Sequence, residues 1–411
     1  MSPSRRTVLA GVGAGLSAVI GSAIGLGVLD DEPLFDFDDD IEEPFRSRIR
    51  NSGQNALEIL PSSPSGPVNV SFFRPSDVDQ ALIDKAEREY RAAMHVAAQP
   101  EVLQVARKYT AGYTGGQTIA FPAPDAVRSK ALELADEDIP PLAEWYPMEP
   151  VVAHELTHAV QFTRFNLTFP DQTYDGREAR THVIEGTASY VESRYRSMCQ
   201  SESDWSCNQV PFSIASISNH PEMVALRKQP YVTGHAFVAE IAERDDWDAI
   251  RSLHESPPVA TVDAMFPGRY HEGPTDPETV SAPEPDREWI QINSNRLGAA
   301  ALYGKLYALG AVDHDVDPRP VSPPEPYRTP LLRSWQGDRI AVYGHVDDPD
   351  RTGHVWQVDF GSKRAAERLA RLVREAYANH GSDHDRGWSF DGRWASVDQS
   401  DRRVTFHSFS E

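Results

Sequence analysis

The chain has 411 residues and a formal net charge of −22, with 62 acidic side chains against 40 basic ones. Only 6 of the basic residues are lysine, and so acidic a composition is typical of proteins that work in high salt, where screening weakens the repulsion between surface charges. Nucleic acid is excluded as an expected partner, because phosphate binding needs a basic face and no Lys/Arg-rich stretch is visible beyond the amino terminus.

The amino terminus carries a pattern typical of export signals. Ser4-Arg5-Arg6 precedes a Gly/Ala-rich apolar run over residues 8–29, which predicts a twin-arginine signal over residues 1–29. Because a run of about 20 apolar residues can span a bilayer, release after cleavage and membrane anchoring through residues 8–29 both remain open. Signal and composition together predict an extracellular or cell-surface protein of a halophilic archaeon.

Charge runs and prolines divide the rest of the chain. The acidic run from Asp30 to Glu43 predicts a disordered spacer over residues 30–66, because so charged a segment buries little apolar surface. The remaining length leaves room for one large domain or two ordinary ones, and two are predicted. The predicted segments are a first domain at residues 67–311, a Pro-rich linker at residues 312–330 and a C-terminal module at residues 331–411.

The first domain is predicted to begin with a helix, a strand and a second helix. Residues 77–98 have a helical pattern of apolar side chains, and residues 115–122 read as a strand. The run over residues 149–162 again reads as a helix, with Pro150 suited to its first turn.

This second helix contains an HExxH motif, His154-Glu-Leu-Thr-His158. Helix positions four apart lie on one face, so the imidazoles of His154 and His158 can bind one zinc ion. Glu155 then lies beside the open coordination position, where it can take a proton from a zinc-bound water and pass it to the leaving amine. The structural alternative is a pair of core histidines satisfied by hydrogen bonds.

A catalytic zinc needs a third protein ligand. The chain lacks the HExxHxxGxxH continuation, which directs the search to a Glu on a following helix. Residues 178–197 read as such a helix, and Glu185 is the best candidate in it. The small residues Gly186 and Ala188 would let this helix approach the HExxH helix closely. His182, one turn before Glu185, is a rival ligand.

HExxH followed by the segment Glu185-Gly-Thr-Ala188 resembles the gluzincin metallopeptidases, the thermolysin-like class in which two His and one Glu hold the zinc. The two motifs are also similar to the HELTHALQDQ-like and EGDA-like motifs of a group of bacterial and haloarchaeal surface proteins in that class. This narrower resemblance covers roughly residues 85–411 and continues through residues 230–238, 247–270 and 335–339.

The resemblance implies an α+β protein. A zincin-like metallopeptidase domain, made of a small sheet and the active-site helices, would precede a small α+β C-terminal module. In that fold an edge strand of the sheet holds an extended peptide by main-chain hydrogen bonds, and residues 117–121 are the candidate for this strand.

The resemblance also implies groups around the zinc. An oxyanion donor is expected downstream of the third ligand, where Tyr231 and His235 fit by order and Tyr190 is a third candidate. The chain departs from the thermolysin-like pattern at Ser189, where those enzymes place an Asp that orients a zinc-ligating His. Ser189 itself and Glu192 are the candidates for that role.

Cys199 and Cys207 follow the presumed ligand helix. In an exported protein they are predicted to form a short-loop disulfide. A second metal site is disfavoured, because nothing around them has ligand spacing.

The C-terminal module is predicted to combine a sheet with one helix. Its predicted strands are residues 338–344, 354–360, 394–397 and 403–408, and its predicted helix is residues 362–378. Residues 335–339 are interpreted as a structural turn, with a role in lining the active-site cleft as the alternative.

These patterns predict an exported zinc metallopeptidase that acts on a peptide or protein. The competing hypothesis is a non-catalytic surface protein that keeps the zinc site for stability and acts through its C-terminal module.

Overall fold

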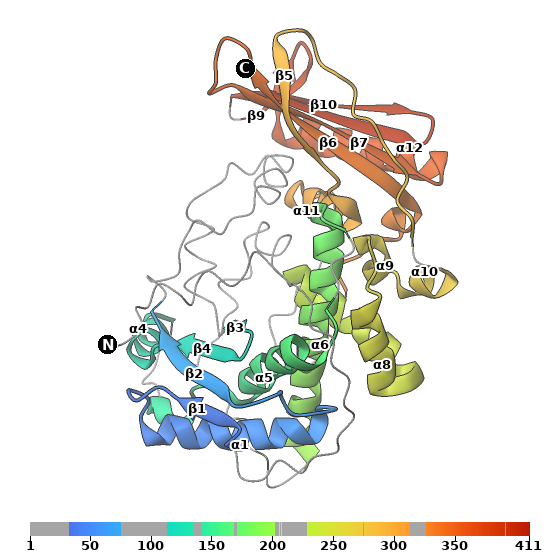
Figure 1. Ribbon diagram of the computed structural model, residues 1–411. Helices are drawn as coiled ribbons and strands as arrows, with labels where there is room; N and C mark the ends of the chain where they lie inside the picture. Colours follow the sequence, from blue (N-terminus) through green and yellow to red (C-terminus); the bar gives the residue numbers. More distant parts are fainter. Residues whose placement is uncertain are drawn as a thin grey trace. The chain divides into compact units, whose positions relative to one another are not determined.

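The computed structural model describes residues 33–74, 113–134, 141–167, 171–201, 205, 207, 228–273, 275–312, 326–390 and 392–411. The predicted export signal and the predicted helix over residues 77–98 lie outside this part of the chain. Among the described residues, no helix is both long and apolar enough to cross a membrane. The protein forms two compact units (Figure 1). The first comprises the described parts of residues 1–74, 110–165 and 194–211, and the second comprises the other described residues.

The first unit is built on a four-stranded sheet. β1 (Phe35–Phe37), β2 (Val68–Phe73) and β4 (Thr118–Pro122) are parallel neighbours, and β3 (Tyr113–Gly115) pairs antiparallel with β4. Between β1 and β2 the chain forms α1 (Glu43–Ile59), which buries Phe45, Ile49 and Ala56 at helical spacing. The unit also contains α4 (Pro124–Leu134), the short helix η4 (Leu142–Glu144) and α5 (Glu149–Arg164). α5 contacts α1, β3 and β4.

The prediction of a disordered spacer over residues 30–66 is wrong. From residue 33 this segment contains β1 and α1 and contributes to the core of the first unit. Phe35 is 4 % exposed and Ile41 2 % exposed, whereas Asp38, Asp39 and Asp40 face solvent. The acidic side chains therefore form the solvated face of a folded segment whose interleaved apolar residues are buried.

The strand predicted at residues 115–122 is confirmed for its greater part as β4. β3 and β4 form a hairpin, and Gly116 supplies the positive φ of 65° that its turn requires. The prediction that residues 117–121 are an edge strand is wrong, because β4 pairs with β2 on one side and with β3 on the other. Its main-chain groups are thus engaged within the sheet.

The second unit begins with helices. The long helix α6 (Tyr174–Ser201) confirms the helix predicted at residues 178–197, and from Arg194 it belongs to the first unit. Further helices among the described residues of this unit are α8 (Gln229–Glu255), α9 (Thr261–Met265), α10 (Pro267–Glu272) and α11 (Gly298–Ala308), which follows the first strand of the C-terminal sheet. In the first unit, Cys199 and Cys207 form the predicted disulfide, with Cα atoms 5.7 Å apart.

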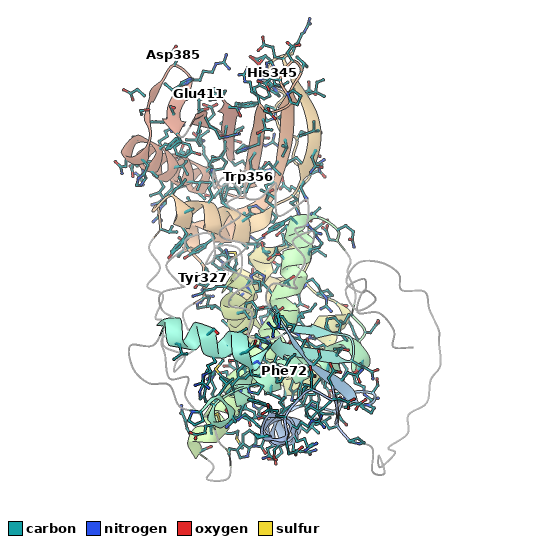
Figure 2. The ribbon with its side chains drawn as sticks, turned by 90° about the vertical axis from the view of Figure 1, so that its left-hand side faces the viewer. Phe72, Tyr327, His345, Trp356, Asp385 and Glu411 are labelled. Carbon is teal, nitrogen blue, oxygen red and sulfur yellow. A yellow bond between two sulfur atoms is a disulfide. The ribbon has the colours of Figure 1, made fainter. Side chains whose placement is uncertain are left out.

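A seven-stranded antiparallel sheet forms the C-terminal part of the second unit. In spatial order its strands are β5 (Trp289–Asn295), β6 (Trp335–His345), β7 (Thr352–Phe360), β11 (Arg403–Ser410), β10 (Arg393–Ser400), β9 (Gly387–Phe390) and β8 (Ser382–His384). α12 (Lys363–His380) packs on one face, where Leu369 and Val373 join the core that contains Trp356 of β7 (Figure 2). Ser362 caps this helix through its side chain.

The C-terminal sheet starts earlier in the chain than the predicted boundary at residue 331. β5 precedes the predicted Pro-rich linker and pairs with β6, so the boundary is wrong. Part of the linker is also packed, since Tyr327 is 1 % exposed and its amide donates to Thr233 Oγ1 at 3.0 Å. Trp335 to Arg339 lie in β6, after the short helix η7 (Pro330–Ser334), and Trp335 is fully buried. The prediction of a turn at residues 335–339 is therefore wrong, because these residues form the first part of a strand.

Candidate metal centre

The HExxH motif lies on a buried part of α5. Pro150 occupies the first turn as predicted, and every residue from Glu149 to Gln161 is buried. His154 and His158 are each 7 % exposed, and Glu155 is 5 % exposed. Polar side chains at such depth need hydrogen-bond partners or a metal ion, because burying them without either costs free energy.

The two imidazoles of the motif converge through their Nε2 atoms. His154 Nε2 and His158 Nε2 lie 3.2 Å apart, and the ring centroids are 4.9 Å apart. Two Zn–N bonds of about 2.0–2.1 Å at a tetrahedral angle place their nitrogen atoms about 3.3 Å apart. The separation of the two Nε2 atoms therefore fits two ligands of one zinc ion.

Glu185 on α6 completes a group of three. One ligand atom each from His154, His158 and Glu185 lie within 4.8 Å of one another, so the group could hold a metal ion. The two histidines are buried and Glu185 is half-buried. Two imidazoles and one carboxylate suit Zn²⁺ and leave a fourth position open, as in catalytic zinc sites. The structure thus brings together the three predicted ligands.

The rival ligand His182 has a different environment. Its ring is fully buried, and its Nδ1 donates to the carbonyl of Glu178 at 2.7 Å. Burial lowers the pKa of His182 to about 4, because the charged imidazolium is poorly solvated there. Among the described residues, His182 does not belong to the group of three that could hold a metal.

Gln161 is an outer partner of the site that the sequence reasoning did not find. It is fully buried, and its Oε1 lies 2.8 Å from Nδ1 of His158. The sequence expectation placed such a partner at Ser189 or Glu192, but Ser189 makes no hydrogen bond to either imidazole among the described residues. The sequence does contain a signal for this partner: Gln161 follows His158 by three residues, and helix positions three apart are neighbours on one face.

Gly186, beside Glu185, permits a close contact with α8 and not the predicted contact with the HExxH helix. A Cβ atom added at Gly186 would overlap the carbonyl group of Gly234 on α8, and one added at Gly234 would overlap the carbonyl oxygen of His182. α6 and α8 therefore cross with their backbones in direct contact. The expectation that Gly186 lets α6 approach the HExxH helix is corrected, because the space at Gly186 is filled by α8.

The candidate oxyanion donors lie at the start of α8. Tyr231 is 43 % exposed in the first turn, and His235 directly follows Gly234 at the crossing with α6. Two residues of α6 face His235: the Tyr190 ring lies 6.4 Å from its ring, and the charge of Glu192 acts on it. Burial lowers the pKa of His235, and Glu192 opposes that shift. The structure therefore brings Tyr190, Glu192 and His235 together.

Comparison with known proteins concerns the C-terminal part of the chain. No curated protein and no solved structure matches the chain. His154, His158 and Glu185 lie before residue 288, where the match to a protein family begins. Residues 288–409, which include the seven-stranded sheet almost completely, match a family described as a domain of unknown function (DUF8575).

Proposed function

We propose that this protein is an exported zinc metallopeptidase of the gluzincin type, which hydrolyses peptide bonds in peptides or proteins. The observation that carries the proposal is the convergence of His154, His158 and Glu185 within 4.8 Å, with Glu155 in the same helix as the two histidines. A structural zinc site usually has four protein ligands, whereas three ligands leave a position for substrate or water.

In the proposed reaction each residue has a distinct part. The bound metal supplies Lewis-acid polarisation of the scissile carbonyl. Glu155 directly follows the ligand His154 and is only 5 % exposed, so it can accept a proton from the attacking water in a poorly solvated place. It then returns the proton to the leaving amine. Tyr231 and His235 are proposed to donate to the oxyanion.

We also propose the location and the partners. The paired arginines at residues 5 and 6 and the apolar run over residues 8–29 support export by the twin-arginine route, with anchoring through that run as one outcome. The net charge of −22 supports an extracellular or cell-surface site in a halophilic archaeon and disfavours nucleic acid as a partner.

Substitution of Glu155 tests the catalytic proposal. Glu155→Gln keeps the volume and removes the base, so we expect full zinc content and loss of cleavage by at least about 100-fold, the scale of general-base catalysis. Zinc is measured by elemental analysis, and cleavage by mass spectrometry of a peptide library in high salt. Glu144→Gln is the matched control, because Glu144 lies in η4 and is not in the metal-binding group. Wild-type cleavage by a zinc-loaded Glu155→Gln variant would refute the proposal.

Removal of the metal separates this function from a structural zinc site. If the zinc is catalytic, chelation abolishes cleavage and leaves the far-ultraviolet circular dichroism spectrum unchanged. If the zinc is structural, chelation unfolds the protein, and no peptide is cleaved at any zinc concentration. The second result would favour a non-catalytic surface protein that acts through its C-terminal module.

A further inference from the structure

One side chain next to the metal-binding group has no part in the function proposed so far. Gln161 lies one helical turn after His158 on α5 and is fully buried. Its amide oxygen is 2.8 Å from Nδ1 of His158. The other nitrogen of the same ring, Nε2, lies 3.2 Å from Nε2 of His154. The imidazole of His158 is therefore held at one nitrogen, while its other nitrogen points to the second ligand.

The contact with Gln161 selects the form of His158 that can bind a metal. An amide oxygen only accepts hydrogen bonds, so the proton of the neutral imidazole must be on Nδ1. The lone pair is then on Nε2, the atom that converges with His154. Without an acceptor at Nδ1, the proton could move to Nε2 and the ring could rotate about its side-chain torsions.

We propose that Gln161 is the positioning residue for His158, and that a neutral amide here fills the role that a carboxylate has in the thermolysin-like pattern. The inference rests on the proposed metal-binding function of the site. Gln161 holds one ligand and does not itself touch the metal.

The chemistry at position 161 gives the proposal a ranked outcome. Gln161→Glu keeps a side chain of the same length with an acceptor oxygen and makes the hydrogen bond to His158 charge-assisted. The stronger hydrogen bond raises the basicity of the imidazole as a metal ligand. Gln161→Met keeps the length and volume and removes the acceptor. A role in metal positioning predicts zinc affinity in the order Glu at least equal to Gln, and Gln above Met by about 10- to 100-fold. A role in packing alone predicts equal zinc affinities and the reverse order for the stability of the metal-free variants, because Met suits a fully buried place and a buried carboxylate does not.

Competition between the protein and a chromophoric chelator for Zn²⁺ measures this order directly. Thr157→Val is the matched control, since Thr157 is equally buried on α5 but its hydroxyl donates to the carbonyl of Ala153 at 2.7 Å. We expect this control to bind zinc as tightly as wild type. The melting temperature of each metal-free variant shows whether the fold is kept.

Replacing Zn²⁺ with Co²⁺ adds a spectroscopic measurement that a role in packing alone would not change. The visible absorption bands of bound Co²⁺ report the ligand field, so Gln161→Met should change their position or intensity, and Gln161→Glu should restore a four-coordinate spectrum close to wild type. Equal zinc affinity and equal cobalt spectra in wild type and Gln161→Met would overturn the inference. If the wild type itself binds neither ion, the proposed metal function fails first, and that result is distinct from the failure of Gln161 alone.

Discussion

The two helices that carry the candidate metal ligands are held in place in different ways. On α5, His154 and His158 stand four residues apart, so the geometry of one helix brings their Nε2 atoms within 3.2 Å. Gln161, which contacts His158, belongs to the same helix. Among the described residues, α6 contributes Glu185 alone to the group that could hold a metal. Its position therefore depends on what holds the whole helix.

The contacts that hold the start of α6 come from distant parts of the sequence. Asp175 is fully buried and accepts from the amide and the hydroxyl of Thr261 at 2.8 and 2.7 Å. Arg296 donates from Nε to Asp175 at 3.0 Å and also pairs with Asp171. The two backbone amides after Arg296 donate to the buried Asp338.

Arg296 and Asp338 both lie in the range that matches the family of unknown function. Within the second unit, that domain is therefore bonded to the helix that carries Glu185. The two histidines therefore depend on local helical geometry, whereas Glu185 depends on tertiary contacts that include residues 288–409. Variants of each kind of contact can test this difference.

The largest effect is expected from Arg296→Met. The change leaves Asp175 buried beside Asp338 without its guanidinium partner, and breaking a buried ion pair in this way costs about 3–5 kcal/mol of unfolding free energy. Denaturant unfolding in high salt at pH 7 measures this loss. Burial raises the pKa of Asp175 to about 6, so the loss should be smaller at pH 5, where a protonated Asp175 no longer needs a cation.

Arg251→Met is the matched control for Arg296→Met. Arg251 pairs with Asp248 at 3.0 Å on the surface of α8, and both side chains are exposed. Exposed pairs contribute about 0–1 kcal/mol. Equal losses in the two variants would contradict the idea that Arg296 anchors α6.

The second effect, of intermediate size, is the change in stability at low pH. Two buried groups of α6, His182 and Asp175, should shift this stability in opposite directions. Burial lowers the pKa of His182 from 6.5 to about 4, so the unfolded chain takes the proton first and stability falls as the pH drops through that range. Burial raises the pKa of Asp175 from 3.8 to about 6, an effect that Arg296 opposes. The folded protein then takes this proton first, and stability rises as the pH drops from about 6 to 4.

Single substitutions should expose these opposite responses. We compare the unfolding free energy of each variant with that of wild type at the same pH. As the pH falls from 7 to 4, this difference should shift in favour of His182→Gln and against Asp175→Asn, each by about 3 kcal/mol. Denaturation of the metal-free protein at several pH values gives both curves. Parallel curves for the two variants would show that other groups control the acid response of α6.

The local part of the site could be predicted from the sequence. Pro150 and the apolar spacing identify α5, and the four-residue separation of the histidines sets their convergence. Glu185 could be chosen as a ligand from its motif and its helix. The position of that helix could not be predicted, because Arg296 lies 121 residues from Asp175 and nothing in either local sequence links them.

The errors in the predicted fold have the same origin. Asp36 to Asp40 have the composition of a disordered spacer, yet the buried contacts of Phe35 and Ile41 outweigh that local signal. Residues 289–295 fall in the predicted first domain because a Pro-rich segment follows them, and only the pairing of β5 with β6 shows that they belong to the C-terminal sheet. Local patterns predict elements well, but long-range pairing decides the domain in which an element lies.

The smallest of the three effects is expected at the crossing of α6 and α8. Gly186→Ala places a methyl group against the carbonyl of Gly234, and a backbone cannot turn away as a side chain can. The helices must separate, at a cost of about 1–3 kcal/mol in unfolding free energy. Because Glu185 is the adjacent residue, the same shift should weaken zinc binding in the chelator competition.

Gly268→Ala is the control for the change at Gly186. Gly268 lies in α10, where an added Cβ atom would come only to 3.9 Å from Nη2 of Arg333, and the methyl group favours the helical conformation. We expect unchanged or slightly increased stability and unchanged zinc affinity. If Gly186→Ala loses stability but keeps wild-type zinc affinity, the crossing supports only the fold. The contacts of Arg296 at the start of α6 would then be sufficient to position Glu185, and the crossing with α8 would not contribute to metal binding.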